Sequence, residues 1–124
     1  MDDSSRRLTA GEQAVLARLR RVCKALDGIS EERDKFGHVA IKVGKQTLAM
    51  LGVTPDGVPS LGLKSDLTTQ AFLVEGGRFY RTPYVGQHGW VSIDGTVRQM
   101  DWPAITDVIT ATYRAVAPKR RGRE

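Results

Sequence analysis

The sequence contains a single cysteine, Cys23, among 124 residues. One thiol excludes an intramolecular disulfide and a zinc site built from several cysteines. The chain also has no apolar run of the roughly 18 residues that a membrane-spanning helix needs, so we expect no membrane association. Residues 1–5 are acidic and polar, unlike the positive and then apolar start of a secretion signal. These absences favour a cytoplasmic protein of bacterial type.

Motifs for catalysis and metal binding are also missing. The sequence has neither Gly-x-Ser-x-Gly nor a phosphate-binding loop, and no nucleophile pattern surrounds His38 or His88. The acidic cluster in residues 31–34 is interleaved with basic side chains, whereas a hard-cation site needs several convergent oxygen ligands. Two distant histidines do not make a zinc site. We therefore expect no enzyme, no metal site and no cofactor.

The basic charge is present but unevenly distributed. The net charge is +5 and the isoelectric point is about 9.7. Residues 1–24 carry six basic and three acidic side chains, and residues 114–124 carry five basic and one acidic. The intervening stretch holds eight bases and ten acids, which makes it slightly acidic. A polyanion would therefore meet most of the excess charge at the two ends of the chain.

A helix near the start of the chain is predicted by its caps and its periodicity. Thr9 and Glu12 have the spacing of a capping box, in which each side chain bonds the backbone amide of the other residue. The apolar residues behind them recur every three or four positions, and Gly28 is suited to end the helix. Cys23 falls on this apolar stripe, so we expect it to be buried.

The period then changes to two, which indicates strands. Residues 39–43 alternate in the manner of a half-buried strand, and Gly44-Lys45 form a plausible tight turn into a partner strand at 46–51. Residues 60–64 form a third, short strand. The stretch 30–37 is charged and is interpreted as a connector.

Two further helices are predicted in the second half of the chain. Ser65 or Asp66 is placed to cap one of them, and Asp101 is placed to cap the last, with Pro103 in its first turn. Extended structure resumes at 79–80, and residues 90–93 form another strand. The resulting order predicts an α+β fold in which an antiparallel sheet of about five strands packs against helices on one face. We expect one domain over residues 1–118 and a solvated basic tail over residues 119–124.

Six short motifs occur in the order found in the MmcQ/YjbR family, which the sequence resembles over about two thirds of its length. They are Phe36-Gly37-His38, Gly44-Lys45, Leu63-Lys64, Phe79-Tyr80-Arg81-Thr82-Pro83-Tyr84, Gly89-Trp90-Val91 and Tyr113-Arg114-Ala115-Val116-Ala117-Pro118-Lys119. The sequence differs at Leu48, where family members often have an aromatic residue. The resemblance implies a CyaY-like (frataxin-like) α+β sandwich. It also implies DNA binding, the activity for which the family is commonly labelled.

If the protein binds DNA, basic side chains should neutralise phosphates without reading sequence, because no helix-turn-helix pattern is present. Tyr84 and Trp90 are candidates for stacking on bases. The candidate nucleic-acid-binding residues are Arg18, Arg21, Lys42, Lys45, Lys64, Arg81, Lys119, Arg120, Arg121 and Arg123.

The alternative is a module that binds a small molecule or another protein. Tyr80, Tyr84, His88 and Trp90 gather aromatic and polar groups along one stretch, which is a suitable lining for a pocket. The same rings would equally serve to pack the loop against the sheet. The sequence leaves these alternatives open.

Overall fold

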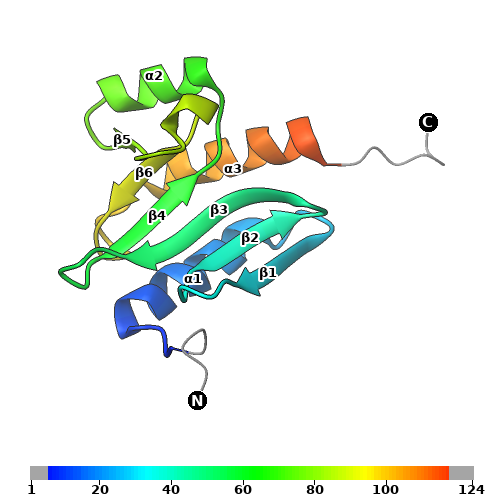
Figure 1. The fold of residues 1–124 in the computed structure, drawn as a ribbon. Helices are drawn as coiled ribbons and strands as arrows, with labels where there is room; N and C mark the ends of the chain where they lie inside the picture. The colour runs from blue at the N-terminus through cyan, green and yellow to red at the C-terminus, as the bar shows by residue number, and fades with distance from the viewer. Residues whose placement is uncertain (1–5, 118–124) are drawn as a thin grey trace.

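The fold is an open sheet of six antiparallel strands with three helices, and the computed structural model describes residues 6–117 (Figure 1). The helices are α1 (Ala10–Cys23), α2 (Leu67–Glu75) and α3 (Trp102–Val116). The strands are β1 (Ile29–Arg33), β2 (Val39–Val43), β3 (Gln46–Val53), β4 (Pro59–Leu63), β5 (Tyr80–Arg81) and β6 (Val91–Asp94). The predicted α+β class with an antiparallel sheet is confirmed.

The strands are ordered β1-β2-β3-β4-β6-β5 across the sheet. Strand β1 was wrongly assigned to a charged connector: it pairs with β2 from Ile29 opposite Val43 to Arg33 opposite Val39. It occupies the sheet edge, and most of its residues are exposed. Charged side chains on an edge strand discourage pairing with other chains. The alternation that reveals a half-buried strand is therefore absent here.

The core lies between the sheet and the two long helices. Helices α1 and α3 both contact β3 and β4, and Figure 1 shows them on the same face of the sheet. The fully buried side chains come from this interface and include Leu19, Leu51, Leu61 and Ile109. Cys23 is buried as predicted, and its burial raises the pKa of its thiol. Cys23 therefore packs as a small apolar side chain.

The start of α1 is fixed by a buried carboxylate. The capping box predicted for Thr9 and Glu12 is present, with the amide of Glu12 donating to Thr9 Oγ1 at 3.0 Å and the amide of Thr9 donating to Glu12 Oε1 at 2.8 Å. Both terminal nitrogens of Arg6 also donate to Glu12, each at 2.9 Å. The Glu12 side chain is 0% exposed, so this pair connects the helix start to the core. Arg6 also donates to the carbonyl of Gly37, which joins the β1–β2 turn to the same cluster.

Helix α2 lies apart from the other two, next to β5 and β6 (Figure 1). Asp66 caps it by accepting a hydrogen bond from the amide of Thr69. Its buried residue is Gln70, whose amide nitrogen donates to the carbonyls of Gly86 and Trp90 at 2.7 and 2.9 Å. The helix therefore positions the loop that leads into β6. No helix within residues 6–117 is long and apolar enough to cross a membrane.

Candidate functional site

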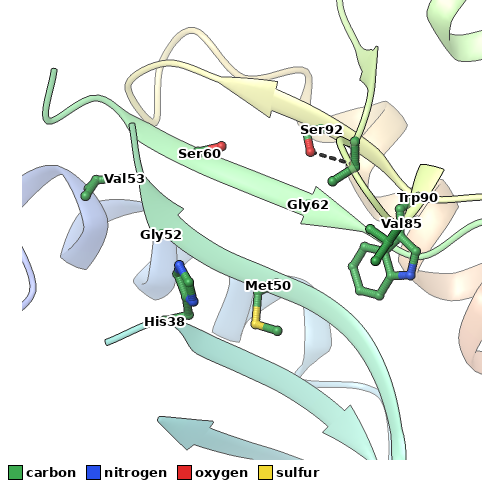
Figure 2. A pocket seen from close by; sticks show the side chains of 10 residues that line it. His38, Met50, Gly52, Val53, Ser60, Gly62, Val85, Trp90 and Ser92 are labelled. Atoms are coloured by element: carbon green, nitrogen blue, oxygen red, sulfur yellow. Dashed lines mark hydrogen bonds between the residues drawn. The ribbon is translucent and has the colours of Figure 1, made fainter. Parts of the chain in front are cut away.

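The face of the sheet that points away from α1 and α3 carries a groove of about 280 Å³ (Figure 2). Side chains along antiparallel strands alternate between the two faces, and small residues fall on this one. Gly52 pairs with Ser60, and Gly62 pairs with Ser92. Because these residues are small, the middle of the face is hollowed between larger side chains. The groove is lined by His38, Met50, Gly52, Val53, Ser60, Gly62, Thr82, Val85, Trp90 and Ser92.

Two rings bound the groove, and each lies against a glycine. A Cβ at Gly52 would come within 2.6 Å of the His38 ring, whereas a Cβ at Gly62 would meet Trp90 at 3.6 Å. Figure 2 shows the two rings at opposite ends, with Met50 between them. The position of His38 therefore depends on the missing side chain at Gly52.

The His38 ring and the backbone of Trp90 are held by neighbouring groups. His38 Nδ1 lies 2.8 Å from Asp34 Oδ2, and the backbone amide of His38 donates to the other oxygen of that carboxylate. Burial opposes the ionisation of Asp34, but these hydrogen bonds outweigh it and lower its pKa. The carbonyl of Trp90 accepts hydrogen bonds from the Gln70 side chain and from the amide of Thr82. Hydrogen bonds therefore fix the position of the His38 ring and of the Trp90 backbone.

The two glycines should respond differently to substitution by alanine. We expect Gly62→Ala to stabilise the protein by about 0.5–1 kcal/mol, because alanine restricts the unfolded chain and its Cβ has room. Gly52→Ala should destabilise it by about 1 kcal/mol, because the new Cβ displaces His38 from Asp34. Urea denaturation of both variants tests this pair. Equal changes in the free energy of unfolding would show that His38 is not held as described.

The polar groups on this face are already paired. Ser60 Oγ and the Tyr80 hydroxyl both donate to Asp94 Oδ1, at 2.7 and 2.8 Å. The hydroxyls of Thr82 and Ser92 lie 2.7 Å apart. Among the described residues, the groove lining includes no Asp, Glu, Lys or Arg side chain. The groove is therefore apolar, with hydroxyl groups on one wall.

The pocket predicted from the aromatic stretch shares only Trp90 with this groove. Tyr80 lies beside Asp94, and Tyr84 is 95% exposed in a loop, where its φ of 69° is unusual for a residue other than glycine. His88 is exposed in a short 3₁₀ helix, Gly86–His88. Sequence reasoning missed His38, although the alternating small residues of β3, β4 and β6 were a signal that this face is open. Whether any of these residues binds a ligand stays a prediction.

Several of the predicted DNA-binding side chains are engaged within the protein. Lys42 pairs with Glu32 at 3.4 Å, and the Arg18 guanidinium lies 5.0 Å from the centre of the Trp102 ring. Lys64 donates to the backbone carbonyls of Ser65 and His88. The Arg81 side chain lies against Gly86, where a Cβ would clash with it. Lys64 and Arg81 both contact the Gly86–His88 helix, whereas Lys42 lies beside Glu32 of β1 and Arg18 lies against Trp102, so the four residues form no single cluster.

The structure brings other basic residues together at one end of the molecule, here called the basic end. The C-terminal ends of α1 and α3 and the β2–β3 turn all lie there (Figure 1). The Tyr113 hydroxyl donates to the carbonyl of Asp27 at 2.7 Å, and Ile29 pairs with Val43, which connects the three segments. The exposed basic side chains of this end are Arg21, Lys24, Lys45 and Arg114.

The four side chains of the basic end form no ion pair within residues 6–117. Arg21 and Lys45 were predicted from sequence, whereas Lys24 and Arg114 were not in the candidate set. The predicted residues Lys119, Arg120, Arg121 and Arg123 lie outside the described residues and follow α3 in sequence. In the part of the chain that the structure describes, no three His, Cys, Asp or Glu residues are grouped to hold a metal ion.

Comparison with known proteins identifies one family and one solved structure. The model of the family described as YjbR matches residues 24–115. The crystal structure of Deinococcus radiodurans protein DR2400, with a DUF419 domain, superposes with a TM-score of 0.65. The two sequences are 20% identical, and the match covers 95% of this chain and 86% of that one. At this identity the likeness concerns the fold. Curated protein sequences give no match.

Proposed function

The chain belongs to the YjbR family, and from this premise we propose that it binds DNA through the phosphate backbone, using the basic end. The observation that supports the proposal is the meeting of four exposed cations from three separate segments. Arg21 lies in the last turn of α1 and Lys24 is its C-cap residue. Lys45 comes from the β2–β3 turn, and Arg114 comes from α3. Because none of them has an acidic partner within the described chain, they are available to an external anion.

Binding of this kind is governed by counterion release. Each phosphate that a lysine or arginine neutralises releases condensed cations, which contributes affinity without sequence preference. Phosphate contacts orient a protein on the duplex, whereas base contacts specify sequence. The basic end contains only the last turns of α1 and α3, so it has no helix that could lie lengthwise in a groove of the DNA. The proposal therefore predicts binding with little dependence on sequence.

The test is duplex binding as a function of salt. Four contacts from the basic end and four from residues 119–123 would give a slope of log affinity against log salt of up to about −7. Affinity should then fall about 10²–10⁴-fold between about 50 and 200 mM salt, measured by fluorescence anisotropy with duplexes of two unrelated sequences. Removal of residues 119–124 should make the slope less steep. An absence of binding at about 50 mM salt would refute the proposal.

A further inference from the structure

We propose that the groove on the open sheet face is a second site, which binds a small, uncharged, planar ring compound. This site is independent of the basic end, because its lining comes from the middle of β3, β4 and β6 and from the loop before β6. Its volume of about 280 Å³ lies near the lower limit of small-molecule pockets, so the occupant is one ring system and not an extended chain.

The preference for a planar ligand follows from the rings that line the groove. The His38 ring lies over Gly52 and the Trp90 ring lies against Gly62, so both rings come close to the backbone of the sheet. The His38 and Trp90 rings stand at the two ends of the groove (Figure 2). Aromatic rings prefer offset-stacked or edge-to-face contacts with other rings, and the Met50 thioether between them also packs well against an aromatic ring.

The requirement for an uncharged ligand follows from the lining, which includes no Asp, Glu, Lys or Arg side chain, and from the partners of the charged groups nearby. Lys42 is paired with Glu32, and Asp34 is hydrogen-bonded to His38. Asp94 accepts hydrogen bonds from Ser60 and Tyr80. An ionised ligand would lose solvation without meeting a free counter-charge, whereas an uncharged ring would lose little. The hydroxyls of Thr82 and Ser92 can hydrogen-bond a polar edge of the ring.

The arrangement of His38 offers one more directional contact. Its Nδ1 faces Asp34, so in the neutral imidazole Nδ1 carries the proton and Nε2 is an acceptor. Nε2 lies 3.2 Å from the position that a Cβ on Gly52 would take, which places it at the floor of the groove. An N–H donor on the edge of the bound ring would match it. Indole, which combines a planar ring with one N–H donor, is therefore the probe of choice.

The experiment titrates the full ¹⁵N-labelled chain with indole and follows the amide resonances. At about 1–10 mM indole, the range in which a ring of this size binds, the amides of Gly52, Gly62 and Trp90 should shift in a saturable way. Trp90→Ala should weaken indole binding about tenfold. Tyr84→Ala, which removes an aromatic ring that is 95% exposed and outside the lining, should leave it unchanged within about twofold.

Four results would overturn the proposal. Equal weakening by Tyr84→Ala would show that indole adheres to any exposed ring. Equal or tighter binding of indole-3-acetate would contradict the requirement for an uncharged ligand. Shifts of the same amides on dilution without indole would show that a second copy of the chain covers the face. An unchanged spectrum at the highest indole concentration would also refute the site, whereas the salt-dependent DNA test would be unaffected by any of these outcomes.

Discussion

Replacing the four cations of the basic end by glutamine should remove most of the DNA affinity. In the variant Arg21→Gln, Lys24→Gln, Lys45→Gln and Arg114→Gln, each lost phosphate contact should make the salt slope about one unit less steep. The affinity for duplex DNA at about 50 mM salt should fall by about a hundredfold or more. All four side chains are exposed, so the fold should be retained, which circular dichroism would verify.

A matched control variant distinguishes the effect of where the cations lie from the effect of the net charge of the protein. Arg7, Lys35, Arg78 and Arg98 are also exposed, and they lie toward the end where α1 and α3 begin. Their joint replacement by glutamine removes the same four charges. We expect this control to keep the wild-type slope within about one unit. If both variants lose affinity equally, binding depends on overall charge and not on the basic end.

The largest expected effect on stability concerns the pair of Arg6 and Glu12. Arg6→Ala should lower the free energy of unfolding by about 3 kcal/mol, because the Glu12 carboxylate is 0% exposed and would lose its cation. Glu12→Gln should cost only about 1 kcal/mol, since glutamine can still complete the capping box. Urea denaturation of both variants provides the measurement. A larger cost for Glu12→Gln than for Arg6→Ala would contradict this account.

The pair of Arg6 and Glu12 also predicts how the free energy of unfolding depends on pH. Burial alone would raise the pKa of Glu12, but hydrogen bonds from Arg6 and Thr9 outweigh it, so the folded-state pKa is lowered. A carboxyl group of this kind stabilises the fold above its unfolded pKa of about 4.3 and loses this contribution as the pH falls through the folded value. The difference in stability between wild type and Arg6→Ala should therefore shrink below about pH 4. A constant difference from pH 7 to pH 3 would show that Glu12 is not the titrating group.

Local signals predicted the helix starts and the central hairpin correctly. The capping box at Thr9 and Glu12, the cap at Asp101 and the turn at Gly44-Lys45 each depend on residues within four positions of one another. Strand β1 was missed because its pairing with β2, and not its own pattern, makes it a strand. An edge strand with one neighbour and polar side chains has no alternation to detect.

The two candidate sites depend on contacts that are distant in sequence. The charge count placed the excess of bases at the chain ends, but Lys45 lies in the acidic middle of the sequence and joins them only through the sheet register. Similarly, His38 and Gly52 are far apart in the chain, and the antiparallel pairing of β2 and β3 brings the ring over the glycine. Sequence periodicity shows which face a residue occupies, but it does not show which residues meet on that face.

Amide chemical-shift mapping with duplex DNA tests the central claim most directly. The full ¹⁵N-labelled chain is titrated with a short duplex at about 50 mM salt, where phosphate contacts are strong. We predict shifts in the last turns of α1 and α3 and at the Gly44-Lys45 turn, together with unperturbed amides at Gly52, at Gly62 and at the starts of α1 and α3. Shifts confined to the groove or to the start of α1 and α3, or an unchanged spectrum, would contradict DNA binding by the basic end.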